Sequence, residues 1–213
     1  YKISFFIFSY YIMVINLKYI YTNNYSNNLE NIIKKVKSCS NVYGLFINVR
    51  DLEVNYNGEF IDLEDYLEKL EDVSKNIILN IIPISNDSSD IVSIKRENKS
   101  YINNIQEITS KIPSLKFLYT STNIRIIEEL TLCFGSKSCG YYISDDLNFF
   151  DSNFYVLPFE KYDVSVVQEQ IKKEKKLMIM VNDVSQYDIL MNFIEDNCFD
   201  KDNFFVIISK TFS

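Results

Sequence analysis

The chain has 213 residues, with 22 basic and 29 acidic side chains, a net charge of −7 and 47% hydrophobic content. This composition is typical of a globular chain that buries a sizeable core. The acidic balance argues against a nucleic-acid partner, because phosphate backbones are bound by clustered Lys and Arg. The sequence contains no histidine, the side chain most often used for proton transfer and metal ligation near neutral pH.

The chain starts with an apolar run from Ile3 to Leu17. This run predicts either the hydrophobic part of a secretion signal or a first buried strand. Ser, Tyr and Asn interrupt it, so it falls short of a confident membrane span. Asn-x-Ser sequons at Asn24, Asn86 and Asn98 fit secretion, which we slightly favour over a cytoplasmic location.

Short apolar runs then alternate with helix-period segments. Beside a first strand within 3–17, strands are expected at 43–49, 76–84, 115–119, 140–144, 154–158, 177–181 and 204–209. Helices are expected at 27–39, 62–73, 101–111, 123–134, 164–175 and 186–197. The polar stretch 85–100 reads as a loop, and Asn57-Gly58 predicts a hairpin. Continuous apolar strands alternating with helices indicate a parallel sheet, and eight such units predict an α/β protein, a (β/α)8 TIM-type barrel of one domain over 1–213.

Four cysteines give no close pair of metal-ligand spacing. They are Cys39, Cys133, Cys139 and Cys198. Cys133 and Cys139 could form a disulfide across a short loop, or both could be free thiols, and the sequence favours neither.

The segment 154–186, FYVLPFEKYDVSVVQEQIKKEKKLMIMVNDVSQ, resembles the glycerophosphodiester phosphodiesterase group of phospholipase-C-like barrels. Pro158, Asn182 and Asp183 fall at the separations expected for its strand, Asn-Pro, helix, strand and Val-Asn-Asp turn. Softer similarities lie in LKFLYTSTN, IDLEDYLEKL and NIILNIIPI. The resemblance implies a barrel, a role in lipid metabolism and a site built on two histidines and a divalent cation.

The residues that the resemblance would make functional are replaced here. The His-Arg that ends the first strand of the family, the Glu-x-Asp of its second strand and the Glu and Lys of its third correspond to Asn16, Leu17, Phe46, Asn48, Ile82 and Ile84. The loop after Arg50, where the second histidine is expected, holds none. Phe and Ile offer no oxygen ligand to Ca²⁺ or Mg²⁺, so the resemblance implies a pseudoenzyme without a cofactor.

Two alternatives stay open. The region 29–86 also resembles the chitinase-type glycoside hydrolase barrel, whose acidic positions would be Tyr43, Phe46, Asn48 and Arg50. There, too, the carboxylic acid needed to protonate the leaving oxygen is missing. The second alternative is a phosphodiester or glycoside hydrolase with a rearranged acidic site that uses Mg²⁺ or Ca²⁺.

Functional groups of a barrel gather at the carboxyl ends of its strands. The candidate binding residues there are Arg50, Asp51, Asn80, Asn182, Asp183 and Lys210. Weak candidates for metal ligation are Asp51, Asp145, Asp146 and Asp183, although helix capping explains such positions equally well. The expected partner is a small molecule, such as a phosphate ester or a sugar, or another protein, and not a nucleic acid.

Overall fold

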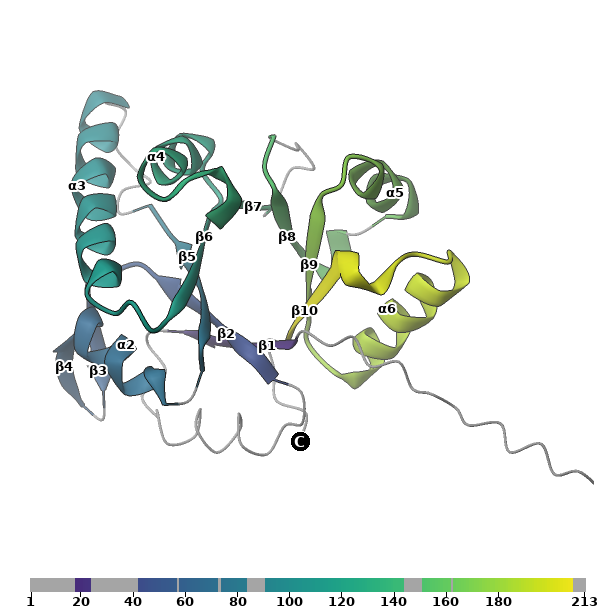
Figure 1. Cartoon of the computed structure of the whole chain (residues 1–213), viewed down its shortest axis with the longest axis horizontal. Helices are drawn as coiled ribbons and strands as arrows, with labels where there is room; N and C mark the ends of the chain where they lie inside the picture. Colours follow the sequence, from purple (N-terminus) through teal and green to yellow (C-terminus); the bar gives the residue numbers. More distant parts are fainter. Residues whose placement is uncertain are drawn as a thin grey trace, which may run out of the picture.

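A computed structural model describes residues 18–23, 42–56, 58–72, 74–83, 91–143, 151–161 and 163–208. Over these residues, eight parallel strands close into a barrel in the order β1-β10-β9-β8-β7-β6-β5-β2, and helices surround it (Figure 1). The barrel strands are β1 (Lys18–Asn23), β2 (Val42–Val49), β5 (Asn76–Ile81), β6 (Lys116–Ser121), β7 (Cys139–Tyr142), β8 (Phe154–Pro158), β9 (Lys176–Val181) and β10 (Phe204–Ile208). The predicted TIM-type barrel is confirmed.

The outer layer consists of helices that follow the strands. They are α2 (Leu63–Glu71), α3 (Ile91–Ser110), α4 (Ile124–Phe134), α5 (Val164–Lys172) and α6 (Val184–Asp196). Short 3₁₀ turns, η1 (Ser136–Ser138), η2 (Phe159–Lys161) and η3 (Lys201–Asn203), complete the connections. No helix among the described residues is long and apolar enough to cross a membrane.

The predicted hairpin is present as β3 (Glu53–Tyr56) and β4 (Glu59–Asp62), which pair antiparallel outside the barrel. Gly58 lies between the two strands and has a φ of +91°. Glycine adopts this left-handed conformation without steric cost because it has no Cβ. The hairpin is inserted between β2 and α2, the helix that leads to β5.

Two sequence predictions differ most from the structure in their boundaries. The first barrel strand is Lys18–Asn23, not a segment within 3–17, which lies outside the described residues. Helix α3 begins at Ile91, ten residues before the predicted start at Tyr101. Its early turns read as loop because they are polar. The helix turns most of these side chains to solvent, and among residues 95–100 only Asn98 is buried.

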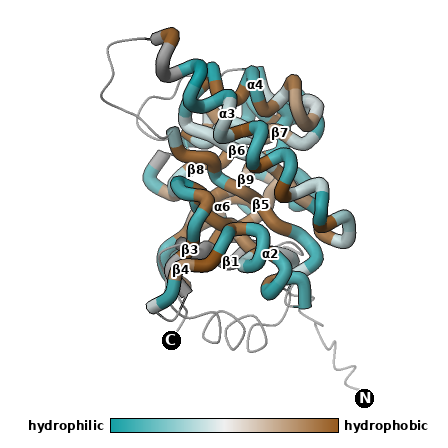
Figure 2. Tube along the Cα trace, turned by 90° about the vertical axis from the view of Figure 1, so that its left-hand side faces the viewer, coloured by the Kyte–Doolittle hydropathy of each residue, from teal (hydrophilic) through white to brown (hydrophobic). Residues whose placement is uncertain are grey.

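The core has two layers, because successive strand residues face opposite sides of the sheet. Figure 2 shows hydrophobic strands inside a more hydrophilic layer of helices. One side of each strand packs against the helices, and the other side fills the barrel. The buried interior cluster is formed by Phe46, Ile78, Phe154, Val156, Met178 and Ile207. The interior therefore holds a packed core and not a pore.

Gly140 is required by this interior packing. A Cβ built on Gly140 would lie 2.0 Å from the ring of Phe154, far inside van der Waals contact. The ring of Phe154 thus occupies the space that a side chain on β7 would need.

Candidate functional site

Three polar residues form a connected row on neighbouring strands near the carboxyl ends of β2, β5 and β6. Asn48 is in register with Asn80, and Asn80 with Thr120. The Nδ2 of Asn80 donates a hydrogen bond to Oδ1 of Asn48 at 2.8 Å, and the Thr120 hydroxyl donates to Oδ1 of Asn80 at 3.0 Å. Thr120 is fully buried, Asn80 is 5% exposed and Asn48 is half-buried. The exposed end of this row is therefore Asn48.

The row faces into the barrel. Phe46 and Ile78 belong to the interior cluster, and side chains two residues further along a strand point to the same side. This places Asn48 and Asn80 directly above the hydrophobic interior, at the mouth. Thr120 joins them through the hydrogen bond to Asn80.

An aromatic residue and a thioether line the opposite side of the mouth. Tyr142 and Met180 are half-buried and pack against the interior cluster. The Tyr142 hydroxyl donates to Sδ of Met180 at 3.2 Å, a weak hydrogen bond because a thioether is a poor acceptor. The ring of Tyr142 lies over Phe46 with centroids 6.2 Å apart.

Inside the rim, the described part of the mouth presents neutral amides, hydroxyls and a thioether, while the charged Arg50, Asp51 and Asp183 lie exposed in the turns around it. Among the described residues no group of three or more carboxylates, cysteines or histidines could hold a metal ion. Neutral amides and hydroxyls bind by hydrogen bonding and do not exchange protons near pH 7. The described site is therefore suited to recognition of a polar ligand.

The family positions on the second and third strands lie in this region. Phe46 is fully buried in the interior, and Asn48 is held by Asn80. Ile82 directly follows β5, where its backbone N–H donates to Val49 O at 3.0 Å. Ile84 lies outside the described residues.

The first-strand positions need a correction. Asn16 and Leu17 lie outside the described residues and precede β1, so they cannot end it. The strand ends at Asn23, which is in register with Asn48. The position of the family histidine therefore moves to the region of Asn23, where this chain again has no imidazole.

The remaining predicted binding residues are spread around the rim. Arg50 and Asp51 are exposed in the turn after β2. Within the described part of the chain, Arg50 makes no ion pair. Asn182 is half-buried directly after β9. Lys210 lies outside the described residues.

Of the predicted metal candidates, the structure describes Asp51 and Asp183, and these two belong to no group of side chains that could hold a metal ion. Asp183 caps α6, since its side chain accepts a hydrogen bond from the Gln186 backbone N–H at 2.9 Å. The same role belongs to Asn123 on α4 and Asp163 on α5. Asp145 and Asp146 lie outside the described residues. Capping accounts for Asp183 without a metal.

Sequence reasoning missed Thr120 and Tyr142. The neighbour of Thr120, Ser121, is also fully buried, but the Ser121 hydroxyl accepts from the Asn123 backbone N–H and stays outside the row. The register pairs Thr120 with Asn80, and this pairing is set by the closure of the barrel. Tyr142 carried no signal in a chain with 16 tyrosines.

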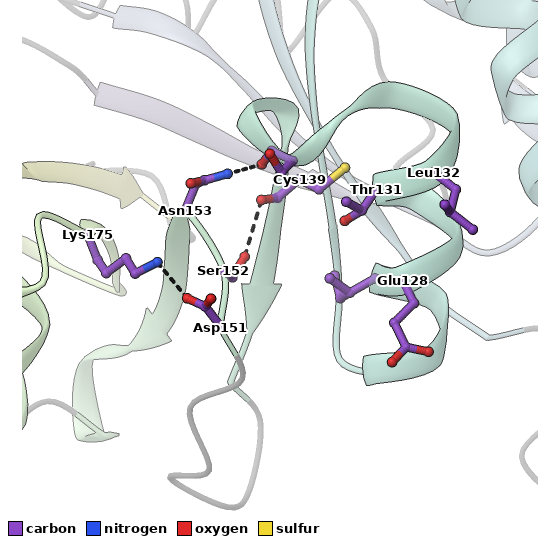
Figure 3. Close-up of a pocket in the computed structure, with 10 residues that line it drawn as sticks. Glu128, Thr131, Leu132, Cys139, Asp151, Ser152, Asn153 and Lys175 are labelled. Carbon is purple, nitrogen blue, oxygen red and sulfur yellow. Dashed lines mark hydrogen bonds and ion pairs between the residues drawn. The ribbon is translucent and has the colours of Figure 1, made fainter.

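A second concave region lies on the outside of the barrel, between α4 and the start of β8 (Figure 3). This lateral groove has a volume of about 690 Å³ and is lined by Ile127, Glu128, Thr131, Leu132, Ser136, Cys139, Asp151, Ser152, Asn153 and Lys175. The described part of the β7–β8 connection contains no helix, so α4 and β8 border the groove directly.

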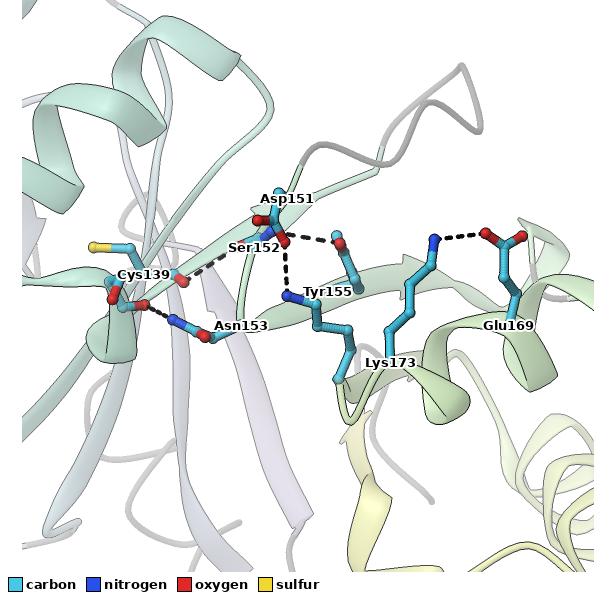
Figure 4. A network of polar contacts seen from close by, with 9 residues as sticks. Cys139, Asp151, Ser152, Asn153, Tyr155, Glu169 and Lys173 are labelled. Atoms are coloured by element: carbon cyan, nitrogen blue, oxygen red, sulfur yellow. Dashed lines mark hydrogen bonds and ion pairs between the residues drawn. The ribbon is translucent and has the colours of Figure 1, made fainter.

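Side chains join β7 to β8 along this groove (Figure 4). The Ser152 hydroxyl donates to Cys139 O at 3.2 Å, and Asn153 donates to Ser136 O. Lys175 Nζ donates to Asp151 Oδ1 at 2.8 Å, and this contact lowers the pKa of the Asp151 carboxyl. These contacts stabilise the barrel where β7 and β8 pair over only two residues each.

The thiol in this groove is not an activated nucleophile. Cys139 is 1% exposed, and burial raises its pKa to about 11. The thiol therefore stays protonated at neutral pH, whereas nucleophilic cysteines react as thiolates. Cys133, Cys139 and Cys198 are all free, so the disulfide alternative for Cys133 and Cys139 is not realised.

No family sequence model and no curated protein matches the chain. Among solved structures, it is similar to a protein of Silicibacter pomeroyi assigned as a glycerophosphoryl diester phosphodiesterase, with 7% identity, a TM-score of 0.61 and 90% of each chain covered. It is also similar to glycerophosphodiester phosphodiesterases of Galdieria sulphuraria (10% identity, TM-score 0.59, 90% of this chain and 93% of the other) and Parabacteroides distasonis (13%, 0.59, 91% and 92%).

These similarities extend over the whole barrel, while the sequence identities are too low to carry an activity from one chain to the other. The family resemblance inferred from the order of sequence motifs is thus confirmed at the level of the fold. The chain has the TIM-barrel fold of the glycerophosphodiester phosphodiesterases.

Proposed function

We propose that this barrel is a catalytically degenerate relative of the phosphodiesterases that binds a neutral, hydrogen-bonding small molecule at its mouth. The observation that carries the proposal is the row from Asn48 through Asn80 to Thr120, which stands on strands where the family resemblance expects charged metal ligands. Asn48, the exposed end of the row, is oriented for recognition by its hydrogen bond from Asn80, and an amide neither binds Mg²⁺ or Ca²⁺ tightly nor transfers protons.

The absence of histidine strengthens the proposal. General acid–base catalysis of phosphodiester cleavage needs groups with pKa values near the working pH. Moving the first-strand position from Asn16 to Asn23 does not supply such a group, because no histidine exists anywhere in the chain. The loss of the acid–base pair therefore does not depend on how the first strand is aligned.

The chemistry of the described mouth favours a polyol or sugar over a phosphate ester. Its accessible polar groups are Asn48, the Tyr142 hydroxyl and, directly after β9, Asn182. These groups donate to and accept from hydroxyls, and one flat side of a sugar packs well against an aromatic ring such as that of Tyr142. Arg50 is exposed in the turn after β2, and we do not assign it to the ligand.

Isothermal titration calorimetry tests this proposal with glycerol, monosaccharides and glycerophosphocholine as probes. Removing one hydrogen bond to a bound ligand costs about 0.5–1.5 kcal/mol, or roughly 2- to 10-fold in Kd. We expect Tyr142→Phe and Asn182→Ala to weaken binding by this amount. Tyr43→Phe is the matched control, because Tyr43 lies near the start of β2, at the opposite end of the barrel.

Two outcomes would overturn the proposal. In the first, none of the probes releases heat or raises the melting temperature. In the second, a probe binds but Tyr142→Phe, Asn182→Ala and Tyr43→Phe leave its Kd unchanged, which would locate the binding site away from the mouth.

A further inference from the structure

Helix α3 carries a cationic face on its first half. Lys95, Arg96 and Lys99 are exposed, and their spacing of three and four residues puts them on one side of the helix. They border a shallow hollow of about 530 Å³ that is lined by Val92, Lys95, Arg96, Lys99, Ser100 and Asn103. This face contrasts with the net charge of −7 of the whole chain.

The charges of this face are only weakly neutralised by the described residues. Lys95 Nζ lies 3.8 Å from Glu129 Oε1, and its side chain remains 63% exposed. Arg96 and Lys99 form no ion pair with any residue that the structure describes. Glu97 is exposed on the neighbouring side of the helix, so the cationic character belongs to one face of α3 and not to the segment as a whole.

An apolar side chain accompanies these charges. Val92 is 74% exposed and shares the hollow with Lys95 and Lys99. The aliphatic stems of lysine and arginine add further apolar surface while their charged ends stay in water. Lys and Arg on an exposed helix face are attracted to anionic lipid headgroups, and an apolar side chain beside them can enter the interface.

The cationic face lies at the same end of the barrel as the mouth. The Tyr101 hydroxyl donates to Val49 O at 2.9 Å, and Val49 is the last residue of β2. Helix α3 connects the parallel strands β5 and β6, so it runs back from the mouth toward the strand starts. The turns before Tyr101, which carry Lys95 and Arg96, therefore lie at the mouth end.

We propose that this face docks the protein on an anionic lipid surface, with Lys95, Arg96 and Lys99 against the headgroup phosphates and Val92 in the interface. Docking through this face would place the lipid surface beside the mouth end of the barrel. The proposal goes beyond ligand binding at the mouth and does not depend on it.

Sedimentation with vesicles at low ionic strength tests the proposal. We expect the protein to sediment with vesicles of phosphatidylcholine and phosphatidylserine, and not with vesicles of phosphatidylcholine alone. Each cation near an anionic surface contributes roughly fivefold, so K95Q/R96Q/K99Q should lower the partition coefficient by roughly a hundredfold. The control is K75Q/K137Q/K172Q, which removes the same charge from exposed lysines on other elements.

Circular dichroism and the urea midpoint establish that each variant is folded. If the triple variant unfolds, Lys99→Gln alone replaces it, with an expected loss of roughly fivefold in the partition coefficient. The proposal is overturned if the protein does not sediment with phosphatidylserine vesicles. That result would be expected if the cationic face binds an acidic protein and not a lipid surface. The proposal is also overturned if the α3 variant and its control lose binding equally, or if added salt leaves sedimentation unchanged.

Discussion

Replacing Asn80 with alanine removes the centre of the polar row at the mouth. The side chain of Asn80 donates to Asn48 and accepts from Thr120, so both hydrogen bonds are lost. Each bond contributes about 1 kcal/mol net. The Thr120 hydroxyl is fully buried and would keep no partner within the row, which costs about 1–3 kcal/mol instead of the net value. Asn48 is half-buried, and water can replace its lost donor at little cost.

We therefore expect Asn80→Ala to lower the free energy of unfolding by about 2–4 kcal/mol. Urea denaturation followed by circular dichroism measures this as a lower midpoint with an unchanged m-value. The matched control is Asn76→Ala on the same strand, whose amide donates to Tyr43 O at 3.0 Å at an exposed position. We expect a loss of about 0.5–1 kcal/mol there.

A double-mutant cycle between Asn80→Ala and Thr120→Val isolates their interaction. Thr120→Val keeps the shape of the side chain and removes the hydroxyl that donates to Asn80. The coupling free energy should be about 1 kcal/mol or more, because either substitution alone breaks the same bond. Strictly additive effects, or an Asn80→Ala loss no greater than that of Asn76→Ala, would refute the reasoning that this row is a buried, connected network.

Three further predictions concern the barrel wall and helix α3. Gly140→Ala should destabilise the protein by about 1–3 kcal/mol or prevent folding, because a Cβ would lie 2.0 Å from the Phe154 ring. A urea midpoint equal to that of the unchanged protein would contradict the close packing of Phe154 on Gly140. Burial raises the pKa of Cys139 from 9.0 to about 11 and that of Tyr119 from 10.0 to about 12. As pH rises, the unfolded state releases the Cys139 and Tyr119 protons before the folded state does. The free energy of unfolding should therefore be unaffected by these groups below pH 9 and should fall as pH rises toward 11 and 12. A urea midpoint that does not fall over this range would argue against the burial of these two groups. Finally, Asn98 is 3% exposed within α3, so its sequon should carry no glycan in folded protein expressed through a secretory pathway, and a glycopeptide containing Asn98 in mass spectrometry would disprove its burial.

The sequence predicted the barrel because its strands are buried on both sides and therefore read as continuous apolar runs. FYVLP became β8 with the expected ends, and the predicted strand 76–84 became β5, which begins as expected and ends at Ile81. Helix α5 ends at Lys172, three residues before its predicted end. The chain leaves the helical conformation there, and Glu174 adopts a φ of 57°, which no pattern of charged residues indicates.

The site was harder to predict because it depends on which strand residues share a level around the barrel. The register that pairs Asn48 with Asn80 and Asn80 with Thr120 follows from the closure of the sheet, not from local sequence. Asn80 was a candidate because it lies near the carboxyl end of its strand, and Asn48 was singled out by the family resemblance. Thr120 did not stand out, since threonine is common in strands for its own conformational reasons.

The most direct test of the central claim is a hydrolysis assay. Purified protein is incubated with glycerophosphocholine in the presence of Mg²⁺ or Ca²⁺, and released glycerol phosphate is measured. A barrel with Phe46, Asn48 and Ile82 at the positions where the family resemblance expects charged metal ligands, in a chain without histidine, should release no more product than a protein-free blank. Turnover that disappears with a chelator and with Asp51→Asn or Asp183→Asn would contradict the account and establish a rearranged acidic site.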